Sequence, residues 1–154
     1  MATINGLDQA AVRPAPLSYL QPPDSVLNML PHFPPLHLSL LISTARLDAI
    51  HNASVVTFAL VYSHYVDLVS RARLQASAAG SIAQATKLWN HDVAAAAWEE
   101  LAEWEIILPA AGKGTEQEQA KMWRCDVVLE EIIEAVGGAD AGMSDVMIRW
   151  CKEI

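Results

Sequence analysis

The sequence contains little that would place the protein in a membrane or outside the cell. None of its apolar runs reaches the eighteen or so residues that a membrane span requires. The longest candidate, LSLLIS at 38–43, is soon followed by Arg46 and Asp48. The opening MATINGLDQAAVRPAP lacks a basic start before an apolar stretch, so we expect no secretory signal. The two cysteines, Cys125 and Cys151, lie in apolar patterns and are expected to be buried free thiols in a reducing compartment.

Positive charge is also scarce. Ten Lys and Arg residues stand against eighteen Asp and Glu residues, which gives a formal net charge of −8. A free-standing DNA-binding protein usually has a basic balance, because counterion release supplies most of its affinity. This chain can therefore meet DNA only through a local patch, and we expect it to bind weakly when isolated.

The motifs of catalysis and of cofactor binding are missing as well. AAGKGT at 110–115 departs from a phosphate-binding loop, because Ile107 stands where the first glycine is needed and Gly114 follows Lys113. The five histidines are scattered, and no Cys or His cluster has metal-ligand spacing. No local signature suggests a catalytic triad. The prediction is a protein that is not an enzyme and needs neither a cofactor nor a metal.

What is present is a large apolar content, 53% of the residues, which excludes wholesale disorder. Seven of the eight prolines lie in residues 1–35, which we interpret as a linker with one possible short helix at DSVLNML. Asp24 would cap that helix and Pro31 would stop it. Residues 36–154 would then form one folded domain.

The hydrophobic periodicity of residues 36–154 predicts a mainly α fold with a small antiparallel β wing. Its order is helix, short strand, helix, helix, strand, polar loop, strand and two C-terminal helices. This is the order of a winged helix, a helix-turn-helix with a β-hairpin wing, to which C-terminal helices are added. The predicted helices are 36–51, 58–76, 90–105, 128–136 and 143–154, and the predicted strands are 55–57, 106–108 and 122–127. The predicted core includes Leu41, Phe58, Tyr62, Val69, Trp98, Leu101 and Cys125.

The helix predicted at 90–105 occupies the position of a DNA-reading helix but is acidic. Asn90 should cap it, and Val93, Ala97, Trp98, Leu101 and Trp104 form one apolar stripe. On the other face it carries Glu99, Glu100 and Glu103, and it has no Lys or Arg. We interpret these glutamates as a solvated face that contacts a neighbouring protein, in preference to paired catalytic carboxylates.

Cations that could meet phosphates occur at two places. Arg71 and Arg73 end the helix at 58–76, and Lys87 follows in the next loop; Lys113 and Lys121 lie in the wing. These five residues are the candidate DNA-binding residues. The alternative is that Arg71 and Arg73 only complement the helix dipole, and that the two wing lysines only lie in a solvent-exposed loop.

The segments LLISTARLDAIHNASVVTFALVYSHYVDLVSRAR, WNHDVAAAAWEELAEWEIILPA, MWRCDVVLEEIIEAV and SDVMIRW carry a family resemblance. In this order, over residues 36–152, they resemble the C-terminal winged-helix domain of the fourth subunit of the eukaryotic origin recognition complex, in a fungal form. The most specific parts are F-x-x-V-Y-x-x-Y at 58–65 and W-E-x-L-x-x-x-x-I-x-x-P at 98–109. Neither part is a catalytic motif.

The resemblance implies a nuclear role in DNA replication, beside other subunits of the complex, duplex origin DNA and the machinery that loads the replicative helicase. It also implies an ATPase-fold module upstream. In yeasts the domain carries an inserted helix that contacts bases, but the loop at 77–89 lacks the basic and aromatic density of such an insertion. Two functions stay open: a DNA-associated assembly module, or a winged-helix scaffold for protein contacts without direct DNA contact.

Overall fold

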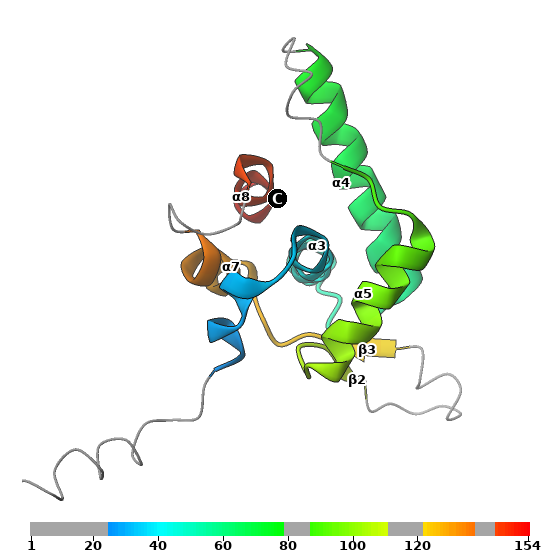
Figure 1. Ribbon diagram of the computed structural model, residues 1–154, viewed down its shortest axis with the longest axis vertical. Helices are drawn as coiled ribbons and strands as arrows, with labels where there is room; N and C mark the ends of the chain where they lie inside the picture. The colour runs from blue at the N-terminus through cyan, green and yellow to red at the C-terminus, as the bar shows by residue number, and fades with distance from the viewer. Residues whose placement is uncertain (1–24, 79–86, 111–121, 138–143) are drawn as a thin grey trace, which may run out of the picture.

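The fold is arranged around one central helix. The computed structural model describes residues 25–78, 87–110, 122–137 and 144–154. Helix α3 (Pro35–His51) lies in the middle of Figure 1, seen nearly end-on. On one side are α4 (Phe58–Ala78) and α5 (His91–Glu103), and on the other are α7 (Leu129–Val136) and α8 (Asp145–Lys152). Within the described ranges, no helix is both long and apolar enough to cross a membrane.

Helix α3 is buried on every side along most of its length, as predicted from its apolar content. All residues of 36–47 are buried, including three with hydroxyl groups. Ser39, Ser43 and Thr44 each donate to the carbonyl oxygen four residues earlier, at 2.7, 2.7 and 2.8 Å, so none of these hydroxyls lacks a partner. The helix ends at Asn52, which adopts the left-handed conformation with φ 55°.

The small sheet joins segments that are far apart in the sequence. Strands β1 (Val56–Thr57), β3 (Met122–Arg124) and β2 (Leu108–Pro109) lie in that order and are antiparallel. Val56 pairs with Trp123 and Leu108 pairs with Arg124. A three-helix core closed by such a sheet confirms the predicted mainly α fold of the winged-helix type.

The segment after α5 differs from the prediction. Ile106 and Ile107 were expected to form a strand with Leu108, but they lie in a turn and the strand is Leu108–Pro109. Glu105 has φ 57°, which reverses the chain at the end of α5. The amides of Ile106 and Ile107 then donate to the carbonyl of Leu101 at 3.0 and 3.4 Å, and both side chains are buried. Their apolar character reflects burial under the helix end and not strand formation.

The last strand is also shorter than predicted, although its alternation is correct. The strand ends at Arg124, yet Trp123 and Cys125 are half-buried and Val127 is buried, whereas Met122 and Asp126 are exposed. The period of two therefore continues beyond the hydrogen-bonded part.

The predicted core is confirmed for Leu41, Val69, Trp98 and Leu101, all of which are buried. It is wrong in degree for Phe58, Tyr62 and Cys125, which are only half-buried. Phe58 and Tyr62 each contact the ring of the exposed His91 edge-on, with ring centroids 5.2 Å apart. This aromatic cluster therefore reaches from the core to the surface.

Residues before α3 form two single-turn 3-10 helices, η1 (Val26–Asn28) and η2 (Leu30–His32). Asp24 lies outside the described residues, and Ser25 caps η1 by accepting from the amide of Leu27 at 3.3 Å. The prediction that Pro31 stops a helix is wrong, because Pro31 lies inside η2. Leu30 and Phe33 belong to the core, and η1 and η2 contact α7. The proposed boundary at residue 36 thus separates segments that pack together.

Candidate functional site

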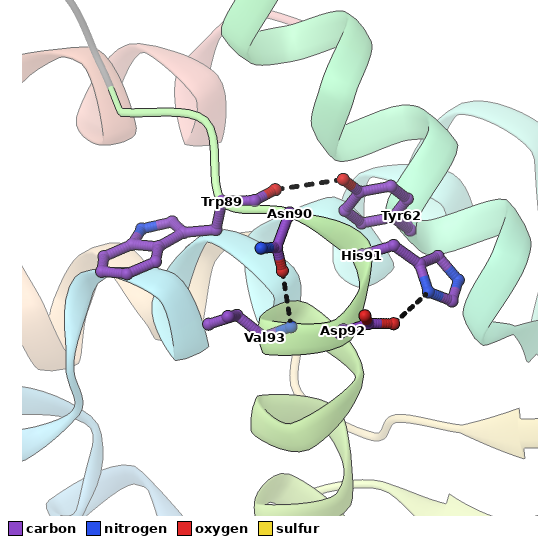
Figure 2. Close-up of polar contacts among 6 residues, drawn as sticks. All are labelled: Tyr62, Trp89, Asn90, His91, Asp92 and Val93. Atoms are coloured by element: carbon purple, nitrogen blue, oxygen red, sulfur yellow. Dashed lines mark hydrogen bonds and ion pairs between the residues drawn. The ribbon is translucent and has the colours of Figure 1, made fainter.

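The start of α5 is fixed by hydrogen bonds from two elements (Figure 2). The side chain of Asn90 accepts from the amide of Val93 at 2.9 Å, which confirms the predicted cap. From α4, the hydroxyl of Tyr62 donates to the carbonyl of Trp89 at 3.0 Å. These contacts hold the chain as it enters the helix, so the direction of α5 is set before its first turn.

The two faces of α5 differ in burial as the pattern predicts. Ala94, Ala97, Trp98 and Leu101 are buried against the core. Val93 was placed in the same stripe, but it is 40% exposed. The predicted protein-contact residues Glu99, Glu100 and Glu103 are exposed.

Glu100 is joined to an aromatic cluster that the sequence did not reveal. Its Oε2 lies 3.1 Å from Nε2 of His37, which is 7% exposed. The His37 ring stacks on Trp104, with centroids 5.2 Å apart and planes at 25°. Trp104 also contacts Phe33, at 5.2 Å. The cluster thus connects α3, the end of α5 and the segment before α3 through ring contacts.

The candidate DNA-binding residues are divided between two described places. Lys87 is exposed beside the start of α5, and its Nζ lies 3.8 Å from the centroid of the Trp89 ring, a cation–π contact. Arg71 and Arg73 are exposed on the last part of α4. Lys113 and Lys121 lie outside the described residues. No contact given by the structure brings Lys87 together with Arg71, so these residues remain separate candidates.

Arg71 lines a cleft of about 400 Å³ between α4 and α8. Two further arginines that sequence reasoning did not select, Arg46 and Arg149, line it as well, together with the acids Asp145 and Glu153. Arg149 Nε is 4.0 Å from Glu153 Oε1, and both side chains are more than half exposed. The side chains that line the cleft therefore include three cations and two anions.

Arg46 serves as a structural cation at the floor of this cleft. It is 5% exposed, and its guanidinium donates to the carbonyl oxygens of Trp150 and Glu153 at the end of α8. Its Nε donates to Nε2 of His64 at 3.2 Å, which requires a neutral His64. Burial, and then the charge of Arg46, lower the pKa of His64 below 6.5. Cations at a helix C-terminus are favoured by its dipole, so Arg46 holds α8 onto the core.

Both cysteines are free thiols, as predicted, but only Cys151 is buried and Cys125 is half-buried. Burial raises the pKa of each thiol to about 11. Both therefore stay protonated near neutral pH and are poor nucleophiles. Within the described ranges, no three His, Cys, Asp or Glu side chains are grouped to hold a metal ion.

These features place the chain in a class of protein: it is a winged-helix-like domain with an acidic third helix and added C-terminal helices. The sequence profile of one family, the C-terminus of origin recognition complex subunit 4, matches residues 2–136. The chain belongs to this family, which confirms the resemblance.

One curated relative is similar over most of the chain. Origin recognition complex subunit 4 of Schizosaccharomyces pombe is 29% identical over 124 residues. The match covers 77% of this chain and 12% of that protein. The chain thus spans a small part of the length of its relative.

Proposed function

We propose that this chain is a DNA-associated module of an origin recognition complex in the nucleus. In this role it contributes to subunit assembly, to origin DNA binding and to helicase loading at the initiation of DNA replication. Family membership supports a role in the complex. One observation supports separate faces of the domain for the protein contact and the DNA contact. That observation is the exposed acidic face of α5, the helix in the position that usually reads DNA.

The acidic face of α5 comprises Glu99, Glu100 and Glu103, and no Lys or Arg occurs between residues 88 and 110. Against phosphates these carboxylates would be repelled, each by a modest amount at physiological screening. Against a basic patch on a neighbouring subunit they would favour the correct register and speed association. We therefore assign this face to a protein contact.

The DNA contact is assigned to Arg71, Arg73 and Lys87, with Lys113 and Lys121 of the wing as further candidates. Arg71 and Arg73 are both exposed, and Arg71 also lines the α4–α8 cleft, where three arginines stand against two acidic side chains. Because the net charge is −8, the isolated domain should bind duplex DNA no more tightly than the roughly 10⁻⁴–10⁻⁶ M of non-specific contacts.

Two double charge reversals test this assignment. Glu99→Lys with Glu103→Lys should weaken incorporation into the complex and slightly strengthen DNA retention by the free domain. Arg71→Glu with Arg73→Glu should lower DNA retention, reduce its salt dependence by about one to two in the log–log slope, and spare assembly. The measurements are co-purification of the subunits and binding to duplex DNA over a salt series. The opposite pattern would show that the two faces are assigned the wrong way round.

The second candidate is a scaffold for protein contacts without direct DNA contact. It is favoured because two cations already have partners within the chain: Arg46 donates to carbonyl oxygens of α8, and Lys87 lies over the ring of Trp89. Salt-sensitive retention of the free domain on duplex DNA discriminates between the two. The scaffold predicts no retention at any salt concentration.

A further inference from the structure

A largely apolar hollow lies beside the acidic face of α5. It has a volume of about 420 Å³ and is lined by Asn28, Met29, His32, Phe33 and Trp104. Met29 is 39% exposed, so the hollow is open at the surface. We call it the tryptophan hollow. Aromatic side chains at the floor of such a depression are typical anchors of protein interfaces, because they offer a large contact area.

The ring of Trp104, which lines the tryptophan hollow, is held by contacts with two other parts of the chain. Phe33, which precedes α3, contacts Trp104 at 5.2 Å, and His37 of α3 stacks on the same ring at 5.2 Å. Glu100 holds His37 through the 3.1 Å contact and keeps a side chain that is 50% exposed. One carboxylate is thereby joined through His37 to the Trp104 ring and still reaches the solvent.

A second, smaller hollow of about 300 Å³ shares Asn28 of η1 with the first. It is lined by Leu27, Pro31 and Ala135, and by the acids Glu131 and Glu134 of α7. None of the residues that the structure shows lining either hollow is a Lys or an Arg. The surface around η1 and η2 therefore combines apolar depressions with acidic side chains from α5 and α7.

We propose that this surface docks a basic segment of a partner protein, with one bulky apolar side chain of the segment in the tryptophan hollow. Basic side chains on one side of that anchor meet Glu100, and those on the other side meet Glu134. Charge complementarity selects this occupant, since an acidic or neutral segment would leave these carboxylates without a partner. The inference rests on the proposed protein-contact role of α5 and adds the chemistry of the partner.

The test uses the whole chain and a fluorescein-labelled synthetic peptide that has two Arg or Lys residues on each side of a central leucine. Binding is followed by fluorescence anisotropy. Replacing the central leucine with serine should weaken binding by about tenfold, as loss of an anchored side chain does. Replacing the basic residues with glutamate should abolish it.

Variants of the protein locate the binding site. Met29→Ser should weaken peptide binding several-fold, while Leu74→Ser, at an apolar residue of α4 that is 71% exposed, should not. Glu134→Lys should weaken it, while Asp126→Lys makes the same charge change at an exposed position that lines neither hollow. Trp104→Leu should have the largest effect. Met29→Ser alters an exposed side chain, so it keeps the test valid if Trp104→Leu fails to fold.

Three results would overturn the proposal: no binding of the basic peptide, equal binding of the leucine and serine peptides, or equal effects of Met29→Ser and Leu74→Ser. A chain that dimerises in sedimentation equilibrium, and loses the dimer on Met29→Ser, would show that a second copy occupies the hollow. The assay involves neither Glu99 nor other subunits. If the peptide does not bind, the proposed protein contact of α5 can still be tested by the effect of the Glu99 and Glu103 reversal on assembly.

Discussion

The acidic face of α5 and the basic edge of the α4–α8 cleft, formed by Arg46, Arg71 and Arg149, use their charges differently. At the basic edge, Arg46 donates to backbone carbonyls of α8 and Arg149 lies 4.0 Å from Glu153. On α5, the structure shows no ion-pair partner among the described residues for Glu99 or Glu103. The cations thus partly stabilise the fold, while the anions remain available to a partner. The sign of a surface patch alone does not reveal this difference.

The largest expected effect concerns the buried face of α5. Leu101 is fully buried, and Leu101→Ala should lower the free energy of unfolding by about 2–5 kcal/mol. Urea denaturation measures the change. A loss below about 1 kcal/mol would mean that α5 does not pack on α3 and α4 as described.

A smaller loss is expected at the basic edge when its structural cation is removed. Arg46→Met keeps much of the volume but leaves the carbonyls of Trp150 and Glu153 and the Nε2 of His64 without their donor. We expect a loss of about 2 kcal/mol in unfolding free energy. Arg149→Met is the matched control, because an exposed pair is worth about 0–1 kcal/mol. Equal losses in the two variants would contradict the structural role of Arg46.

The pH dependence of stability sharpens the same contrast. The pKa of His64 is lowered from 6.5, mainly by burial and next by Arg46. Below pH 6.5, His64 therefore takes up a proton more readily in the unfolded chain than in the folded chain. The contribution of neutral His64 to folding stability is present above pH 6.5, and it is lost as the pH falls towards the pKa of His64 in the folded chain. His64→Gln retains an acceptor for Arg46 and should lose less stability between pH 7 and pH 5. Identical losses in thermal midpoint would refute this.

The smallest effect on stability is expected on the exposed face of α5. Glu99→Lys with Glu103→Lys should change the unfolding free energy by no more than about 0.5 kcal/mol per site, because exposed helix positions tolerate such changes. The variant should nevertheless assemble less well into the complex. A strongly destabilised variant would mean that these glutamates support the fold, and any assembly defect would then be secondary.

Much of the fold could be predicted from the sequence, because periodicity and caps are local signals. The helices around Val69 and Leu101 follow their apolar spacing, α3 follows its apolar content, and Asn90 caps α5 as its side chain suggests. The prediction of a strand at Ile106 was wrong. The chain reverses at Glu105, which has a positive φ, and a glutamate does not indicate such a conformation in the sequence.

The candidate sites depended on contacts between distant parts of the chain. Exposure of Glu99, Glu100 and Glu103 was predictable from the helical pattern. The contact of Glu100 with His37 spans 63 positions, and no local pattern reports it. Arg46 did carry a usable signal, because an arginine within an otherwise apolar helix must find acceptors when it is buried.

In the proposed orientation, α5 faces a neighbouring subunit and the end of α4 faces DNA. Photo-reactive amino acids placed singly at positions 99 and 71, in the assembled complex on duplex DNA, test it most directly. The proposed orientation predicts that the probe at 99 cross-links to a neighbouring subunit and that the probe at 71 cross-links to DNA. Cross-linking of position 99 to DNA, with position 71 linked only to protein, would contradict the proposed orientation.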